Sequence, residues 1–331
     1  MPISLCIDKH AYQKKNVYQK AASLNYRDIK NILVIKFAGL GDLLLTSPFL
    51  KTIRRNFPNA KITLITDIKP FFHPGLYDEL IVIKRRKGIL NDIQNFKKCM
   101  ALPFQELILD ITESTRSMII TRAVKGYLKI GYKHKGLDFL FYDIAINRTS
   151  FKFEADSFLD ILRVLGIEGN FLDFEMPEPV IMPLEKDSVY ICLVVGSAMP
   201  EKNWPLQNYF RLAQMIRNDT PNCRFVIPVG PSENKEEIEN IFKQDKSLFE
   251  KVIFVFPLLE FAYYAVNSKI CITNDTGLYH LSIAYKVPTL VIFQCGHQYR
   301  YCPRTEKHQY ISQDNGGIEP ENVYQRYLRM I

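Results

Sequence analysis

Short apolar runs alternate along the chain with segments in which apolar side chains recur at the spacing of a helix face. In the N-terminal half, the runs predict strands at residues 32–37, 61–66, 80–83, 106–111 and 128–131. The segments between them predict helices at about 43–54, 90–100, 114–124 and 155–165. Strand–helix–strand order is typical of βαβ units, which build a parallel sheet.

The same alternation starts again after a proline-rich segment. Strands are predicted at 189–195, 224–229, 252–256, 269–273 and 289–293, and helices begin near Pro205, Ser232, Leu258 and Asp275. Between the two halves, residues 174–183 carry three prolines in ten positions, which favours a stiff, extended linker.

These patterns predict an α/β protein with two doubly wound domains that face a central cleft. The domains lie at 31–173 and 185–317, and the linker at 174–184. Residues 1–30 form an N-terminal arm whose helical pattern is weak. A last helix at 318–331 can pack back on the N-terminal domain.

The strongest candidate site follows the strand at 269–273. The strand breaks at a turn of small and polar residues, and a helical pattern begins directly afterwards. The free N–H groups and the positive dipole end of such a helix bind anions. Asp275 or Thr276 can cap this helix; Thr276 and His280 lie one turn apart, with Gly277 between them. The alternative is a capped helix with a buried histidine.

Asp42 is the second candidate. It opens a predicted helix directly after a strand and a turn that contains Gly39 and Gly41. The glycines allow a sharp turn and a close approach to a ligand. At the carboxyl edge of the sheet, Asp42 is placed to act as a general base. The alternative is that its carboxylate only stabilises the helix N-terminus.

Two further strand ends in the C-terminal half carry polar residues. One strand ends at Gly196 and Ser197, and Lys202 lies in the loop before the next helix. A lysine there suits the charge of a leaving phosphate, although an exposed loop lysine is the plainer interpretation. Glu233 follows the next strand and is either a first-turn helix stabiliser or a hydrogen-bond acceptor for a ribose or base.

Composition narrows the possible functions. With 331 residues, 47% of them hydrophobic and 24% charged, the chain is predicted to be a soluble globular protein. The net charge of +8 suggests an anionic partner. No apolar run is long enough to span a bilayer, and the first thirty residues lack the apolar core of a signal peptide, so we predict a cytoplasmic protein.

The motifs that the chain lacks also matter. The seven cysteines form no CxxC pair, which favours reduced thiols over structural zinc. No D-x-D occurs, so a divalent metal has no obvious carboxylate ligands. G-x-S-x-G, the P-loop and a full dinucleotide fingerprint are absent, which argues against a hydrolase, a P-loop enzyme and an NAD-dependent oxidoreductase.

Three stretches resemble the bacterial heptosyltransferases, glycosyltransferase family 9. Residues 32–42 with Pro48 and 53–58 resemble the N-terminal signature of that family. Lys202-Asn203-Trp204-Pro205 is similar to its Lys-x-Trp-Pro stretch. Asn274-Asp275-Thr276-Gly277-Leu278 with His280 is similar to its Asp-[Thr/Ser]-Gly-x-x-His box, and 287–289 follow as expected. The resemblance spans about residues 31 to 305 in the same order.

The resemblance implies a GT-B fold and an inverting, metal-independent transfer of a sugar without cofactor. The donor would be ADP-L-glycero-β-D-manno-heptose and the acceptor the Kdo or heptose of the lipopolysaccharide inner core, with no nucleic-acid partner. Residues 31–173 would then bind the acceptor, and residues 185–317 the nucleotide sugar.

The resemblance also implies roles for individual residues. Asp42 corresponds to the catalytic base, Lys202 to the residue that neutralises the donor diphosphate, and Asp275 to a contact with donor sugar hydroxyls. Thr276, Gly277 and His280 would lie beside the phosphates, Glu233 near the nucleoside, and Gly196 and Ser197 on the donor side. After Phe293, residues 294–298 replace the usual Gly-Pro-Thr of the family, which leaves the donor sugar open.

Basic residues in the N-terminal half suggest where the acceptor binds. They are Lys84, Arg85, Arg86 and Lys87, and further along Lys129, Lys133 and Lys135. A solvated face is the default interpretation. The alternative is attraction to phosphorylated lipid A and an anionic membrane. On that basis we predict acceptor contacts from these residues and from Gly39 and Gly41, with peripheral association on the inner face of the inner membrane.

Other functions stay open at this point. A relative can use a different nucleotide sugar or acceptor. The chain can also be a nucleotide-sugar-binding protein without turnover, because fold alone never guarantees activity. The presence of Asp42, Lys202, Asp275 and His280 together favours the enzyme.

Overall fold

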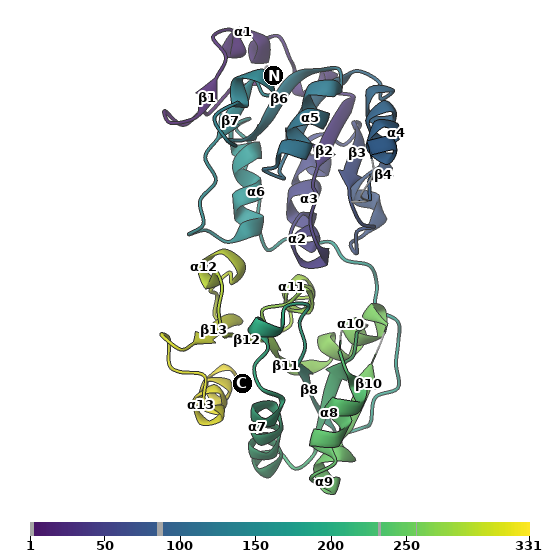
Figure 1. The fold of residues 1–331 in the computed structure, drawn as a ribbon, viewed down its shortest axis with the longest axis vertical. Helices are drawn as coiled ribbons and strands as arrows, with labels where there is room; N and C mark the ends of the chain where they lie inside the picture. Colours follow the sequence, from purple (N-terminus) through teal and green to yellow (C-terminus); the bar gives the residue numbers. More distant parts are fainter. Residues whose placement is uncertain (1–2, 85–88, 231–232, 256) are drawn as a thin grey trace. The chain divides into compact units, whose positions relative to one another are not determined.

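The structure, a computed structural model, describes residues 3–84, 89–230, 233–255 and 257–331. The chain forms two compact units, Met1–Pro177 and Glu178–Ile331. The boundary falls within residues 174–184, the segment predicted as a linker. Each unit contains one sheet with helices on both of its faces (Figure 1).

Unit 1 contains a seven-stranded sheet in the order β1-β7-β6-β5-β2-β3-β4. All neighbours are parallel except β1 and β7. The strands are β1 Tyr12–Gln13, β2 Asn31–Ile35, β3 Lys61–Thr66, β4 Glu79–Val82, β5 Gln105–Asp110, β6 Gly126–Tyr132 and β7 Ile144–Ile146. The helices are α1 Val17–Ala22, α2 Leu40–Leu44, α3 Ser47–Asn56, α4 Ile89–Met100, α5 Thr115–Ala123 and α6 Glu154–Arg163. Short 3-10 turns lie at Tyr26–Asp28, Pro74–Leu76 and Asp138–Leu140.

Unit 2 contains a six-stranded, fully parallel sheet in the order β10-β9-β8-β11-β12-β13. The strands are β8 Val189–Val194, β9 Cys223–Pro228, β10 Val252–Val255, β11 Ser268–Asn274, β12 Thr289–Phe293 and β13 His308–Ser312. The helices are α7 Leu206–Asp219, α8 Lys235–Phe242, α9 Lys246–Phe249, α10 Leu258–Val266, α11 Gly277–Ala284, α12 Gln298–Tyr301 and α13 Pro320–Met330. A 3-10 turn lies at Pro200–Lys202.

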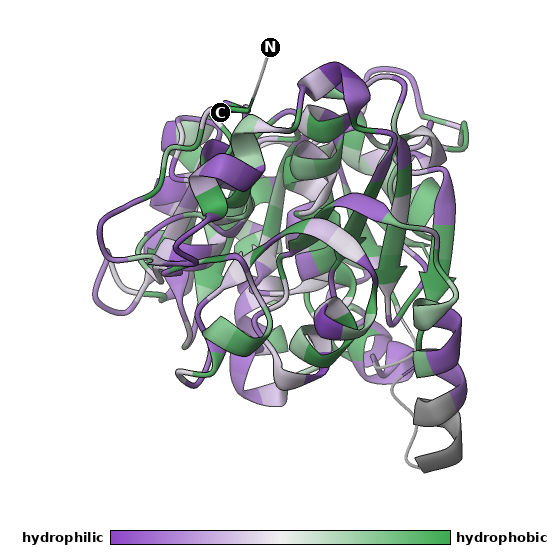
Figure 2. Ribbon diagram, turned by 90° about the horizontal axis from the view of Figure 1, so that it is seen from above, coloured by the Kyte–Doolittle hydropathy of each residue, from purple (hydrophilic) through white to green (hydrophobic). Residues whose placement is uncertain are grey.

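Both sheets are doubly wound from a central pair of strands. In unit 1 the chain proceeds from β2 towards β4 and then from β5 towards β7, so that β2 and β5 lie side by side. In unit 2 the corresponding pair is β8 and β11. The chain leaves such a pair in opposite directions, and ligands of α/β sheets bind at the crevice this creates. The central strands are buried, and the strands are drawn largely in the hydrophobic colour in Figure 2.

The structure divides the first predicted helix. A single helix was expected at 43–54, but α2 ends at Leu44 and α3 begins at Ser47. Pro48 lies in the first turn of α3. It has no N–H to donate to a preceding carbonyl, so it favours a new helix start over the continuation of the old helix.

The N-terminal arm is part of unit 1. Strand β1 pairs with β7 in antiparallel orientation, and α1 buries Val17 and Ala21. The ammonium groups of Lys14 and Lys20 lie 3.2 and 2.9 Å from the carboxylate oxygens of Asp143. Strands β1 and β7 are too short for alternation to reveal them, and the sequence pattern missed both.

The last helix packs within unit 2. The apolar face of α13 lies against α7, and Val323, Tyr324 and Tyr327 are buried in the unit 2 core. The structure thus assigns the apolar face of α13 to the unit 2 core, and packing on the N-terminal domain stays a prediction. The helical spacing of its apolar residues showed that the helix buries one face, but it did not show against what.

Candidate functional site

The carboxyl edge of the unit 2 sheet brings two of the predicted residues together. Lys202 ends the 3-10 turn after β8, and Asp275 follows β11. The Lys202 Nζ lies 2.6 Å from Asp275 Oδ2, and the Asp275 side chain is only 5% exposed. Because β8 and β11 are the central strands, this ion pair lies at the point where the chain direction diverges.

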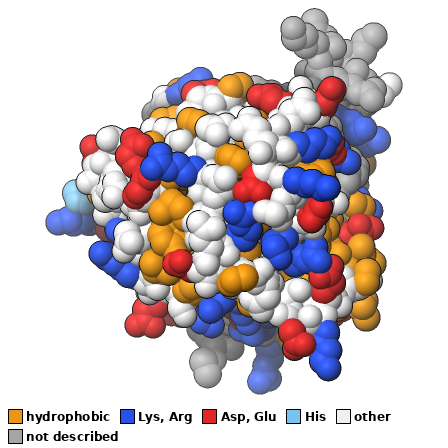
Figure 3. All heavy atoms as spheres, turned by 90° about the horizontal axis from the view of Figure 1, so that it is seen from below, with side chains coloured by type: hydrophobic (Ala, Val, Ile, Leu, Met, Phe, Trp, Pro, Cys, Tyr) orange, Lys and Arg blue, Asp and Glu red, His pale blue; other side chains and the backbone are white. Residues whose placement is uncertain are grey.

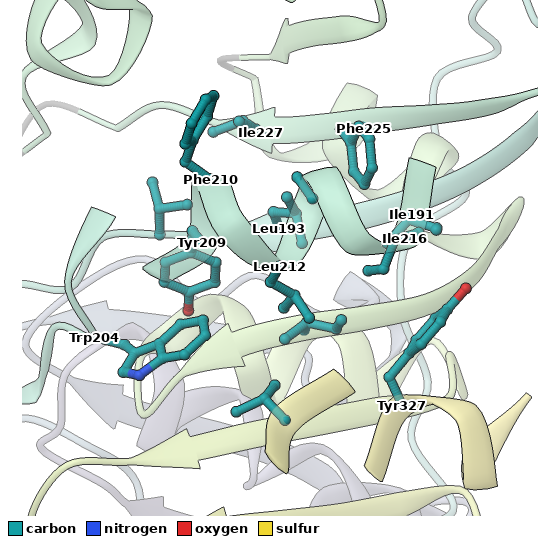
Figure 4. Packing of buried hydrophobic residues seen from close by; sticks show 14 of the residues in the cluster. Ile191, Leu193, Trp204, Tyr209, Phe210, Leu212, Ile216, Phe225, Ile227 and Tyr327 are labelled. Carbon is teal, nitrogen blue, oxygen red and sulfur yellow. The ribbon is translucent and has the colours of Figure 1, made fainter. Parts of the chain in front are cut away.

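Asn274 holds the two loops in place. Its Oδ1 accepts hydrogen bonds from the Trp204 N–H at 2.9 Å and from the Tyr209 hydroxyl at 3.1 Å. Its Nδ2 donates to the Val195 carbonyl at 2.8 Å. The rings of Trp204 and Tyr209 pack edge to face, with centroids 4.8 Å apart (Figure 4). This bridging role was not predicted from the sequence. The polar residue at the end of an apolar run could have indicated it.

Replacing Asn274 with leucine tests this bridge. The change leaves the buried Trp204 N–H and the Val195 carbonyl without their side-chain partner, so we expect a loss of about 2–4 kcal/mol in the free energy of unfolding. The matched variant Tyr209→Phe removes one hydroxyl and should cost about 1 kcal/mol. Urea unfolding of unit 2 measures both, and equal losses in the two variants would contradict the bridging role.

Helix α11 begins directly beside the ion pair. Thr276 occupies the N-cap position but makes no side-chain capping hydrogen bond. As expected, Thr276 is the N-cap residue of α11. The expected hydrogen bond between its side chain and the helix backbone is not formed. Asp275 is engaged with Lys202 instead, so the first N–H groups of α11, from Gly277 onward, receive no capping side chain from Thr276. Such an end suits an anionic group.

His280 lies one turn into α11 and is buried. Its ring centroid is 4.9 Å from that of Tyr279 and 5.7 Å from that of Tyr301. The Lys202 Nζ in turn lies 5.9 Å from the centroid of the Tyr301 ring. Tyr301 therefore connects the histidine to the ion pair, a contact that the sequence did not predict.

The segment that departs from the family pattern also borders this site. Gly296 has a φ of +111°, and a Cβ built on it would lie 3.5 Å from Asp275 Oδ2. The Cys295 thiol lies 3.5 Å from the carbonyl of Glu201, next to Lys202. The loop after β12 thus lies against the ion pair, and the left-handed backbone at Gly296 favours glycine there.

Glu233 joins the loops after β8 and β9. Its Oε2 accepts a hydrogen bond from the Gly230 N–H at 2.7 Å. A Cβ on Gly196 would collide with the Glu233 side chain, so this close approach requires glycine. The Ser197 hydroxyl donates to the Met199 carbonyl at 2.7 Å and stabilises the turn before Lys202. Glu233, Gly196 and Ser197 therefore lie on the same edge as the ion pair.

In unit 1, Asp42 lies in the first turn of α2 and is partly exposed. Among the described residues its carboxylate has no hydrogen-bonding or ion-pair partner. The preceding loop is held from both sides: the Ala38 N–H donates to Asp67 Oδ1 and the Phe37 N–H to Thr112 Oγ1, both at 3.0 Å. Asp42 is thus presented from a fixed loop at the carboxyl edge of the unit 1 sheet.

The two glycines beside Asp42 act differently from the expectation. Gly39 has a φ of −66°, which any residue adopts, so the sharp turn does not require glycine there. A Cβ on Gly39 would meet nothing within 4 Å. Gly41 is buried in α2. The open space beside Gly39 is compatible with the predicted close approach of a ligand. The predicted need for glycine in the turn is wrong at Gly39, because other residues adopt the same φ.

A buried charged cluster lies at the same edge and was not predicted. Lys36 Nζ lies 4.0 Å from Glu154 Oε1 and 4.1 Å from the centroid of the Phe158 ring. The Arg148 guanidinium pairs with Glu154 and, at 3.0 Å, with Glu113. The sequence signal was the lysine inside an apolar run, which requires a partner when it is buried.

The basic residues predicted to bind the acceptor separate into three groups. Lys84 is exposed beyond β4. Arg85 and Arg86, with Lys87, lie outside the described residues. Lys133 follows β6 and its ammonium donates to the carbonyl of His10 in the arm. Among the described residues, the structure therefore places Lys84 and Lys133 at the carboxyl edge, with the exposed Lys135 in the loop that follows β6.

Lys129 has a structural role instead. Its Nζ donates to the carbonyls of Thr121 and Val124, each at 2.7 Å, at the end of α5. Helix α5 runs antiparallel to the strands, so its last residue lies at the amino edge of the sheet, opposite Asp42. The prediction that Lys129 binds the acceptor is corrected, because this ammonium caps a helix C-terminus.

The pH dependence of stability tests the role of Lys129. Burial lowers the pKa of Lys129 to about 8, and the nearby Arg122 contributes to this shift. The unfolded chain, with the ordinary lysine pKa of about 10.4, holds the proton more tightly. From about pH 8 to about pH 10.4, the Lys129 contribution to the free energy of unfolding should therefore increase. The stability advantage of the wild type over Lys129→Met should grow across this window, while the KM for the acceptor stays the same. A raised KM without this pH effect would restore the acceptor role.

No helix within the described residues is both long enough and apolar enough to cross a membrane. Within the same residues, no group of three or more His, Cys, Asp or Glu side chains is arranged to hold a metal ion. All cysteines are free thiols, with Cys6 and Cys295 exposed and the others buried.

Comparison with known proteins finds similarity in both sequence and fold. The sequence model of glycosyltransferase family 9 (heptosyltransferase) matches residues 101–329. Lipopolysaccharide heptosyltransferase 1 of Pseudomonas aeruginosa is 23% identical over 291 residues, which cover 79% of this chain and 78% of that protein.

Two solved structures resemble the fold. A family 9 glycosyl transferase from Veillonella parvula has a TM-score of 0.73 and 21% identity, covering 92% of this chain and 98% of its own. The E. coli heptosyltransferase WaaC with ADP has a TM-score of 0.71 and 16% identity, covering 91% of this chain and 100% of its own.

The two doubly wound domains have the GT-B fold that the solved heptosyltransferase structures share. Because the family model covers more than half of the sequence, the chain belongs to glycosyltransferase family 9, the heptosyltransferases.

Proposed function

We propose that the protein transfers heptose from ADP-L-glycero-β-D-manno-heptose to the Kdo or heptose of the lipopolysaccharide inner core. The transfer inverts the anomeric configuration and requires neither a metal ion nor a cofactor. The observation that carries this proposal is the Lys202–Asp275 pair beside the N-terminus of α11. It combines a cation, a carboxylate and a helix N-terminus at which Thr276 makes no side-chain capping bond, and these together suit a sugar diphosphate.

Each group has a role in the transfer. Asp42 takes the proton of the acceptor hydroxyl, and the resulting oxygen nucleophile attacks the anomeric carbon of the heptose. The bond from that carbon to the diphosphate oxygen breaks on the opposite face, and ADP leaves with the electron pair. Lys202 and the N-terminus of α11 stabilise the negative charge that develops on ADP. Asp275 accepts hydrogen bonds from the heptose hydroxyls.

The remaining residues bind the two substrates. On the donor side, Thr276, Gly277 and His280 lie beside the phosphates, and Gly196 and Ser197 border them. Glu233 accepts a hydrogen bond from the nucleoside. On the acceptor side, Gly39 leaves space near the base with Gly41 beside it, and Lys84 and Lys133 attract the acidic core. The protein works in the cytoplasm at the inner face of the inner membrane, where that acceptor is found.

The names of similar proteins support this choice of substrates. The P. aeruginosa relative is a lipopolysaccharide heptosyltransferase, and a Campylobacter jejuni protein of 23% identity over 266 residues is lipooligosaccharide heptosyltransferase 2. E. coli heptosyltransferase WaaC has been solved with ADP and with ADP-2-deoxy-2-fluoro heptose.

One observation favours a second candidate within the same family. The segment that includes Cys295 and Gly296 lies against Asp275, and it departs from the pattern of the family. In this second candidate function, the enzyme uses a different nucleotide sugar as its donor. A further alternative is a protein that binds a nucleotide sugar but does not catalyse its transfer.

The deciding experiment measures ADP release from ADP-heptose with and without a Kdo-lipid A acceptor. Release that depends on the acceptor and persists in EDTA, with an inverted linkage by NMR, is the expected result. Donor binding without release would support the binding protein. Failure to bind ADP-heptose, followed by binding in a screen of other nucleotide sugars, would support the alternative donor.

A further inference from the structure

The loop between β6 and β7 exposes three large apolar side chains within one turn. Leu137, Phe139 and Leu140 are 50%, 50% and 49% exposed. We call these three residues the apolar turn. Single exposed apolar residues are common on protein surfaces, but a contiguous group of large ones marks an interaction surface.

Hydrogen bonds hold the apolar turn in its outward conformation. The buried Asp138 accepts a hydrogen bond from the His134 N–H on its Oδ1 at 2.6 Å. The Leu140 N–H donates to the Leu137 carbonyl at 3.1 Å and the Tyr142 N–H to the Asp138 carbonyl at 2.9 Å. The acidic residue therefore points inward while the apolar residues point outward, the reverse of the usual arrangement.

The backbone and the loop ends are fixed as well. Lys135 and Gly136 both adopt left-handed conformations, with φ of +58° and +71°, and turn the chain into the apolar segment. At the far end the Tyr142 hydroxyl donates to the buried carboxylate of Asp110 at 2.6 Å. The exposure of the apolar turn is thus built into the fold, and the backbone needs little further ordering for binding.

The exposed charges around the apolar turn are mostly basic, with Asp8 as an acidic exception. Lys135 is exposed next to it, and the Lys133 ammonium donates to the carbonyl of His10, which brings the exposed Lys9 and His10 of the arm alongside. Asp8, the acidic residue of that arm turn, accepts a hydrogen bond from the His10 N–H. By contrast, basic and acidic side chains are interspersed over the face drawn in Figure 3.

The loop begins at the same edge of the unit 1 sheet as Asp42, and it then returns to the amino edge because β6 and β7 are parallel. Lys133 leaves β6 at its carboxyl end, and His134 Nε2 lies 3.4 Å from the Thr115 hydroxyl at the start of α5. Because α5 follows β5, its first residue also lies at the carboxyl edge. The hydrogen bond from the His134 N–H to Asp138 keeps the apolar turn close to this carboxyl edge, where Asp42 also lies.

We propose that the apolar turn and its basic rim are a membrane-docking surface, which inserts into the interfacial region of an anionic bilayer. Large apolar side chains beside lysines are the chemistry that binds such surfaces, since the first enter the acyl boundary and the second pair with lipid phosphates. The inference rests on the proposed function in one respect: a lipid-linked acceptor would be presented at this edge.

The test is co-sedimentation of the full-length protein with vesicles of phosphatidylcholine containing about one third phosphatidylglycerol. The wild type is expected to bind these vesicles. Its binding should be weaker at high salt, and weaker to vesicles of pure phosphatidylcholine. The triple variant L137S/F139S/L140S should bind at least about tenfold more weakly than the wild type, because it loses the apolar contribution to binding. Lys135→Glu should weaken binding to anionic vesicles and leave binding to neutral ones unchanged.

A control separates this surface from general surface hydrophobicity. Val180 and Ile181 are 48% and 81% exposed, and V180S/I181S should bind vesicles as the wild type does. Thermal unfolding confirms that each variant is folded. The proposal is overturned if the wild type binds no vesicle, if the triple variant binds equally well, or if the control loses as much. Self-association of the wild type through the apolar turn, without vesicle binding, would also overturn it in favour of a second copy as partner.

A water-soluble, truncated core acceptor separates the two proposals. The triple variant should use it as well as the wild type does, because none of its three changes touches the donor or base residues. Vesicle binding that depends on the apolar turn, in a protein that transfers no sugar, would leave the docking surface intact and overturn the function. Transfer of the sugar to the soluble acceptor by a protein that binds no vesicles would support the proposed function and overturn the docking surface.

Discussion

Replacing Asp42 with asparagine is expected to lower kcat by about 10²- to 10⁴-fold, the contribution typical of a general base. Asparagine keeps the size and one oxygen of the side chain but cannot take the proton of the acceptor hydroxyl. The position of Asp42 in the first turn of α2 does not depend on its charge, because the preceding loop is held through Ala38 and Phe37. The fold should therefore persist in the variant.

The matched control for this change is Asp67→Asn. Asp67 supports the same loop by accepting the Ala38 N–H, and asparagine retains an oxygen for that bond. We expect its kcat to stay close to that of the wild type.

Kinetics with ADP-heptose and a soluble acceptor measure these effects. If Asp42→Asn kept most of its kcat and lost only about 0.3–1 kcal/mol of stability, Asp42 would be a helix stabiliser and the base would lie elsewhere.

Replacing Lys202 with methionine is expected to lower kcat by about 10²- to 10³-fold, as for the loss of one preorganised group that stabilises developing charge. The ammonium now lies 2.6 Å from Asp275 Oδ2. Its removal should also destabilise unit 2 by on the order of 2 kcal/mol, because a nearly buried carboxylate loses its counter-ion. This is less than the cost for a fully buried pair, since the Lys202 side chain is 20% exposed.

A double variant distinguishes catalysis from stability. Adding Asp275→Asn to Lys202→Met removes the unpaired charge and should recover most of the lost stability. It should not recover kcat, because the cation that faces the leaving ADP is still missing. Urea unfolding and steady-state kinetics measure the two quantities separately. Recovery of both in the double variant would show that the pair only stabilises the fold.

Much of the fold was predictable because each element carries its own pattern. The strand at residues 32–37 and the helix after Ser114 both appear near their expected positions, and Ser114 caps α5 through its hydroxyl. Elements with too few residues to show a period were missed, such as β1 and β7. The break between α2 and α3 was missed because Pro48 was weighed as part of a family signature and not as a helix start.

The candidate site was predictable in part for the same reason. Lys202 and Asp275 both follow apolar runs, and parallel strands bring their carboxyl ends to one edge. Lys129 was placed wrongly because a positive charge in the sequence does not reveal its partner. Only the packing of α5 showed that this ammonium caps a helix.

The sequence by itself determined the family, the order of strands and helices, and the residue types available for chemistry. The tertiary structure alone decided which of them meet: Lys202 bonds to Asp275, 73 positions away. It also placed Asn274 as the bridge between two loops and turned Leu137, Phe139 and Leu140 outward. The physical reason is that hydrophobic periodicity records whether a side chain is buried, which is a local property. Which groups then lie together depends on how the strands are ordered in the sheet, and no short segment carries that information.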